Sequence, residues 1–202
     1  MKNLMKYLSA VIVALFCIGF TACSSDDDED GSGGGKGSST LTIDSKKTSV
    51  PYACWHISEA DRYNNRELHL EFFSYDFISL YTNPTAGKYP TSVDYIGIDC
   101  EIDESMVEPE SMTIPGGSYH LYVALGVAEH DEGWQAENWD NATSDSPLVI
   151  KRSGNTYTVT IENAKIYHFE EGDNPHDQSN TASTLSFSYK GSIGVMPEGF
   201  FE

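Results

Sequence analysis

The segment Tyr119-His120-Leu121-Tyr122-Val123-Ala124-Leu125 decides the fold class of this chain. Its odd-numbered positions are all large and apolar, and the side chains between them form a second, wetter face. Because successive side chains of a β-strand point to opposite faces, this alternation predicts a strand with one face on a core. Four further segments alternate in the same way: 68–72, 95–102, 156–161 and 184–189.

Turn-forming residues separate these segments, as in Pro115-Gly116-Gly117 and Ser153-Gly154-Asn155. Shorter strands are predicted at 41–44, 50–57, 77–81, 148–152 and 165–169, and no long helical periodicity is present. About eight or nine short antiparallel strands, each with one apolar face, indicate either two packed sheets or a barrel. We predict an all-β antiparallel sandwich, because no strand looks long enough to close a membrane barrel.

The first 23 residues have the order of a secretory signal peptide. Lys2 and Lys6 precede an apolar run over 7–20, and the small residues Thr21 and Ala22 follow it. The run is too short to cross a bilayer comfortably, which takes about 20 apolar residues. This order therefore predicts a leader that is removed.

Cys23 follows the small residues directly, so the segment resembles a bacterial lipoprotein signal with its lipobox. The resemblance implies cleavage after residue 22 and acylation of Cys23, which anchors the mature protein in a membrane. Ser24 is not the aspartate of an inner-membrane retention signal, so we expect the outer membrane. The run Ser25-Asp26-Asp27-Asp28-Glu29-Asp30 resembles the surface-export signal of lipoproteins from the Bacteroidetes, and its other interpretation is a solvated spacer.

Three regions follow from these observations. Residues 1–22 are the signal peptide, 23–39 are a lipidated, acidic and Gly/Ser-rich tether of flexible composition, and 40–202 are one β-domain. Two passages, 153–159 and 186–191, have a Gly-x-x-Tyr strand followed by a Ser-Tyr-x-Gly strand. This order resembles small surface lipoproteins of the Bacteroidetes, and the resemblance implies a β-domain at the cell surface without a known activity.

The chain has a formal net charge of −19, with 31 acidic and 12 basic residues. Loss of the leader removes two lysines and no acid, which makes the mature protein more acidic. A field of that sign repels phosphate backbones. We therefore exclude nucleic acid as a partner and expect the membrane, through the lipid, and a glycan or surface protein.

Cys54 and Cys100 are the cysteines that remain once Cys17 is removed and Cys23 is acylated. An even pair in an exported protein suggests a disulfide, and the alternative is two buried thiols in separate strands.

Six histidines are spread along the chain, and two of those on predicted strands, His69 and His120, fall on wet faces. We predict no metal site, because the HxH and HExxH spacings of zinc proteins are absent. Calcium is the alternative cofactor, with oxygen ligands in 99–104, 129–132 and 170–177, none of which follows an EF-hand pattern.

The polar segment 129–141 holds the predicted ligand site. We expect it to be an irregular connection in which Trp134 and Trp139 stack on a sugar ring. Asp131, Glu137 and Asp140 would take the sugar hydroxyls. The alternative is that both indoles fold back and cap the core.

The sequence carries no nucleophile signature and no phosphate-binding loop, so we predict that the protein is not an enzyme. The predicted function is a surface-anchored outer-membrane lipoprotein that binds a glycan or a surface partner. A structural or assembly accessory that adds an edge strand to a partner is the alternative. A hydrolase ranks third.

Overall fold

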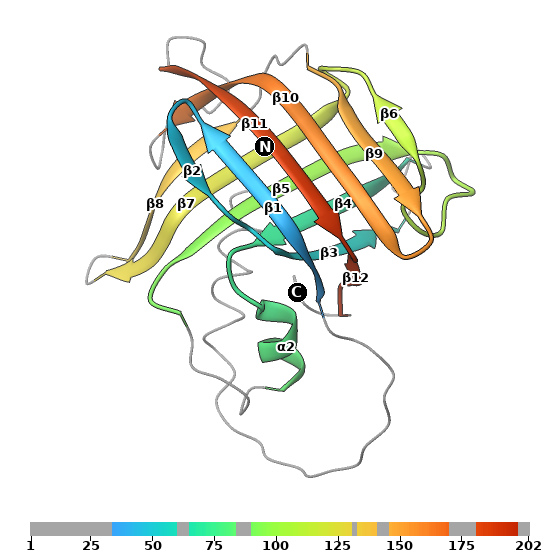
Figure 1. The fold of residues 1–202 in the computed structure, drawn as a ribbon, viewed down its shortest axis with the longest axis horizontal. Helices are drawn as coiled ribbons and strands as arrows, with labels where there is room; N and C mark the ends of the chain where they lie inside the picture. The colour runs from blue at the N-terminus through green and yellow to red at the C-terminus, as the bar shows by residue number, and fades with distance from the viewer. Residues whose placement is uncertain are drawn as a thin grey trace.

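One antiparallel sheet makes up most of the protein in the computed structural model, which describes residues 34–59, 65–83, 90–130, 133–140, 146–169 and 181–197 (Figure 1). The elements, in chain order, are β1 (Gly35–Ile43), β2 (Lys46–Thr48), β3 (Tyr52–Ile57), β4 (Arg66–Phe73), α2 (Phe77–Thr82), β5 (Val93–Ile102), β6 (Met112–Ile114), β7 (Tyr119–His130), β8 (Gly133–Asp140), β9 (Leu148–Ser153), β10 (Thr156–Phe169), β11 (Ala182–Gly191) and β12 (Gly194–Val195).

The sheet closes into an eight-stranded antiparallel barrel, so the predicted sandwich is wrong. The barrel strands follow one another around the wall in the order β1, β3, β4, β5, β7, β8, β10 and β11. Strand β11 pairs with β10 on one side and with β1 on the other, which joins the two ends of the sheet. The all-β class and the antiparallel pairing of the barrel strands are confirmed, and the short β12 pairs with β3 in parallel.

Long, bent strands explain the closure. Strand β10 is continuous over the two segments that were predicted as separate strands, 156–161 and 165–169, and its register with β11 shifts between Ile161 and Ala164. Strand β7 has a similar shift against β8 at Gly126, whose φ is +66°. Such bulges bend a strand and increase its twist, which curls the sheet toward its own far edge.

Two glycines form the seam where the barrel closes. Gly37 of β1 lies opposite Gly191 of β11, and a Cβ atom on either would overlap the backbone of the other strand. Strand β1 therefore begins at Gly35, inside the segment 23–39 that composition assigned to the tether. At Gly37 the missing side chain allows the close approach of the two backbones, so residues 35–39 lie in β1 and not in the predicted tether.

The barrel interior is filled by the apolar faces of the strands. Phe72 of β4 contacts Phe187 and Tyr189 of β11, with ring centroids 4.8 and 5.1 Å apart. Each fully buried side chain of this size contributes roughly 1.5–3 kcal/mol. The interior cluster also includes Leu41, Leu68, Leu70, Ile96, Ile98, Leu121, Val123, Trp139, Leu148, Ile150, Val159, Ile161, Ile166 and Leu185.

Helix α2 packs on the outside of the barrel, where a strand at 77–81 was predicted. Asp76 caps the helix by accepting a hydrogen bond from the backbone N–H of Ser79 at 3.0 Å. Phe77 and Ile78 then cover the outward side of β3 and β4 around Cys54. Among the described residues, no helix combines the length and the apolar character needed to cross a membrane.

Candidate functional site

Four polar side chains line up across neighbouring strands on the outside of the barrel. The strand register places His56 of β3 opposite His69 of β4, His69 opposite Asp99 of β5, and Asp99 opposite His120 of β7. Directly opposed residues project from the same face of a sheet. We call His56, His69, Asp99 and His120 the imidazole–carboxylate row.

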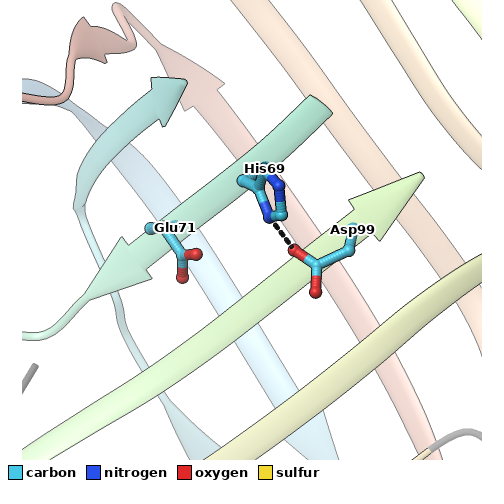
Figure 2. Close-up of side chains that lie close together, drawn as sticks. All are labelled: His69, Glu71 and Asp99. Carbon is cyan, nitrogen blue, oxygen red and sulfur yellow. Dashed lines mark hydrogen bonds and ion pairs between the residues drawn. The ribbon is translucent and has the colours of Figure 1, made fainter. Parts of the chain in front are cut away.

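The row is joined by direct contacts around Asp99. Its Oδ1 atom lies 2.7 Å from Nδ1 of His69, as the dashed line in Figure 2 shows, and its Oδ2 atom lies 3.9 Å from Nδ1 of His120. The ring of His56 stacks on that of His69 with centroids 4.2 Å apart and planes within 4° of parallel. The side chains of His69, Asp99 and His120 are 19%, 23% and 30% exposed, so solvent reaches a site that is otherwise half-buried.

Glu71 extends the cluster along β4, two residues after His69 on the same face (Figure 2). It is the one buried polar or charged residue among those that the structure describes, at 4% exposure. The Tyr95 hydroxyl donates a hydrogen bond to Oε2 of Glu71. One nitrogen or carboxylate oxygen atom from each of His69, Glu71 and Asp99 lies within 4.8 Å of the other two.

Gly97 makes room for the contact between Tyr95 and Glu71. It lies opposite Glu71 in the β4–β5 register, on the outward face of the sheet. A Cβ atom at this position would overlap the Tyr95 hydroxyl and would lie 3.1 Å from Oε2 of Glu71. The missing side chain lets Tyr95 lie along its own strand and reach the buried carboxyl group.

The cluster shifts the pKa values of its members, lowering those of Asp99 and His56 and raising that of Glu71. Burial opposes ionisation of Asp99, but the neighbouring imidazoles of His120 and His69 outweigh it and lower the Asp99 pKa to about 2. Burial, reinforced by the neighbouring His69, lowers the pKa of His56 to about 4. Burial and the Asp99 charge raise the pKa of Glu71, against the opposing effect of the Tyr95 hydrogen bond. Asp99 is therefore held as the carboxylate, while His56 is held neutral.

The predicted sugar-binding segment has a different structure from the one expected. Residues 129–140 belong to the β7–β8 hairpin, apart from the two residues 131 and 132, which lie outside the described part. Trp139 is 5% exposed inside the barrel and meets the His168 ring edge-to-face, with centroids 5.3 Å apart. It is a core residue, so the exposed pair of indoles predicted from sequence is wrong for Trp139.

The other predicted ligand-binding residues are only partly described. The backbones of Trp134, Glu137 and Asp140 lie in β8, opposite Glu129, Leu125 and Tyr122 of β7. The side chains of these three β8 residues lie outside the described part of the structure, as does Asp131. The lipidation residue Cys23 is also outside it.

Cys54 and Cys100 are free thiols in the structure and are not brought together. Cys54 lies on the outward face beneath α2, whereas Cys100 faces the interior and its Sγ is 3.8 Å from the carbonyl oxygen of Leu68. Strand β4 separates their strands, and the two cysteines pair with residues three positions apart on it, so they lie more than about 9.5 Å apart. A disulfide cannot span that separation, so the interpretation as two buried thiols replaces it.

The row was not found from the sequence, although two of its histidines had been placed on wet faces. Its members are 13, 30 and 21 positions apart along the chain, because each comes from a different strand. The available signal was a polar residue at an outward position in four successive strands. Only the register turns that signal into a cluster.

Imidazole and carboxylate groups held this close together can bind cations or exchange protons with a ligand. Comparison of the chain with family models, with curated proteins and with solved structures gives no match. The proposals below therefore start from the geometry of the row and from the N-terminal signal.

Proposed function

We propose that this protein is a lipid-anchored binding module of the outer membrane, exposed at the cell surface, which takes its ligand on the outward face of β3, β4, β5 and β7. The observation that carries the binding site is the imidazole–carboxylate row. The anchoring rests on the sequence around Cys23.

The row is a better binding surface than the barrel interior. The interior is occupied by apolar side chains from all sides, whereas the row presents donor groups at the outside of the wall. Partial burial of a polar group costs free energy unless the group has a hydrogen-bond or ion-pair partner. Asp99 finds two imidazoles, which leaves a preorganised set of groups at a solvent-accessible position.

The row is also better supported than the tryptophan segment. Sugar recognition was predicted from two exposed indoles, and Trp139 is withdrawn into the core. Closure of the barrel also weakens the case for an accessory that adds an edge strand to a partner. The strands β2 and β6, which pair with β1 and β9 outside the closed wall, have three residues each and offer a partner strand little to pair with. We therefore place a non-catalytic binding role first and edge-strand assembly second.

The anchoring is tested by labelling cells of the native host with a palmitate analogue and fractionating their membranes. The wild-type protein should be labelled and should be degraded by protease added to intact cells. Cys23→Ala should abolish the label and release the protein from the membrane. The matched control Cys17→Ala changes a cysteine within the predicted leader and should behave as wild type.

A second variant separates anchoring from surface export. Replacing Asp26, Asp27, Asp28, Glu29 and Asp30 with asparagine or glutamine should preserve the label and the membrane fraction. It should also protect the protein from external protease, since the export signal is then lost. Membrane attachment of the Cys23→Ala protein would overturn the lipoprotein assignment, and protease sensitivity of the acidic-run variant would overturn the export signal.

A further inference from the structure

We propose that His69, Glu71, Asp99 and His120 form a binding site for a divalent transition-metal ion of the zinc class. This inference rests on the proposed function, because the ion would bind on the same outward face and would be the ligand that the module takes there.

The donor atoms are already near the spacing that an ion needs. Zinc binds imidazole nitrogen and carboxylate oxygen at about 2.0–2.2 Å, so tetrahedral donors lie roughly 3.4 Å apart. The donor atoms of His69, Glu71 and Asp99 lie within 4.8 Å of one another, and His120 lies 3.9 Å from Asp99. For an ion to lie between them, the 2.7 Å contact of His69 with Asp99 must open by about 0.7 Å, and the widest pair must approach by up to about 1.4 Å.

Two carboxylates flank the His69 ring, one beside each ring nitrogen. Its Nδ1 atom faces Asp99, while its Nε2 atom lies 3.8 Å from Oε2 of Glu67. Ligating histidines usually direct the second ring nitrogen to a carboxylate or a carbonyl group, which fixes the ring. Stacking on His56 restrains the same ring plane from the other side.

The mixed donor set favours some ions over others. Imidazole suits Zn²⁺, Cu²⁺, Ni²⁺ and Fe²⁺, whereas Ca²⁺ and Mg²⁺ prefer oxygen ligands. Two imidazoles and two carboxylates match the first group. The sequence-based prediction was different: it gave no metal site, with calcium as the alternative because acidic stretches offer oxygen ligands.

The test uses the full chain purified from membranes in detergent and stripped with EDTA. Zn²⁺ should bind stoichiometrically and raise the thermal unfolding temperature, and Ca²⁺ at the same concentration should not. Co²⁺ should give visible absorption bands that Zn²⁺ removes. His69→Gln, Asp99→Asn and His120→Gln should each weaken Zn²⁺ binding by more than the roughly 10- to 100-fold typical of outer-shell changes.

Two matched controls accompany these variants. His130→Gln changes a histidine at the far end of the same strand as His120, and Asp103→Asn changes an exposed aspartate whose side chain accepts hydrogen bonds from Ser105 in its own turn. Both should bind Zn²⁺ as wild type does. Equal affinity in the row variants, or no saturable Zn²⁺ binding by wild type, would overturn the proposal and leave the row as a structural polar network.

Histidine modification keeps the test decisive if the row variants do not fold. In the wild-type protein, Zn²⁺ should slow reaction of His69 and His120 with diethyl pyrocarbonate, as measured by peptide mass spectrometry. Unchanged rates at both histidines would refute the site. The Cys23→Ala protein should bind Zn²⁺ normally, so a failure of anchoring and a failure of the metal site give different results.

Discussion

Replacing Gly97 with alanine is expected to destabilise this barrel, although the same change inside a strand normally stabilises by roughly 0.5–1 kcal/mol. The added methyl group would overlap the Tyr95 hydroxyl and press on Oε2 of Glu71. Tyr95 must then move, and the buried Glu71 loses its hydrogen-bond donor.

The size of the effect follows from these contacts. A buried polar group that loses its partner costs about 1–3 kcal/mol, and overpacking costs a further 1–3 kcal/mol or so. After the gain from removing a glycine, we expect Gly97→Ala to lower the free energy of unfolding by about 2–4 kcal/mol. Urea unfolding in EDTA, followed by tryptophan fluorescence, measures this change.

Tyr95→Phe is the matched control, because it removes the same hydrogen bond without adding a methyl group. It should cost about 1–3 kcal/mol. In the double variant the phenylalanine lacks the hydroxyl that the methyl group meets, so the combined loss should be smaller than the sum. A Gly97→Ala protein as stable as wild type, or strict additivity, would refute the role assigned to Gly97.

Three further results are expected. Trp139→Ala should lower the free energy of unfolding by about 3–5 kcal/mol, as for other buried aromatic residues, and a surface-like change under about 0.5 kcal/mol would contradict its place in the core. In EDTA, stability should fall as pH drops from about 6.5 to 4, because the unfolded chain binds a proton at His56 that the folded chain refuses, and should fall again between about 3.8 and 2 through Asp99. The loss of stability caused by His56 is at most about 3 kcal/mol, and about half of that once solvent screening is allowed for. In a plot of the urea midpoint against pH, His56→Gln should therefore flatten the part between about pH 6.5 and 4, and Asp99→Asn the part between about pH 3.8 and 2. Mass spectrometry of the unreduced protein should find Cys54 and Cys100 as thiols that alkylate only after unfolding, and a mass lower by the two hydrogens of a disulfide would count against the two-thiol structure.

The five alternating segments of the sequence are all confirmed as strands, because the period of two records a local property of each strand. The segment 77–81 was wrongly predicted to be a strand, because a local pattern this short does not distinguish a strand from a helix. Six residues are too few to show a helical period, and the helix depends on the Asp76 cap and on packing of Phe77 and Ile78 against β3 and β4. The failure at Trp139 is similar, since charged neighbours hid an inward position.

The choice between a sandwich and a barrel depended on contacts between the two ends of the described chain. Both architectures need the same alternation, so the apolar pattern does not distinguish them. The bulges near Gly126 and Asn163 bend two strands, and the Gly37–Gly191 seam lets β1 and β11 meet. These features are visible in the sequence only as ordinary turn and linker residues.

The sequence by itself determined the alternating strands and their apolar faces, because these depend on neighbouring residues along the chain, and attachment to the membrane stays a prediction from the N-terminal signal. Only the tertiary structure decided the closed barrel and the imidazole–carboxylate row. The row joins residues from β3, β4, β5 and β7, and a shift of one residue in any of these pairings would turn a member to the opposite face. Register is set by how the whole sheet packs, so the site exists only once the barrel has closed around its core.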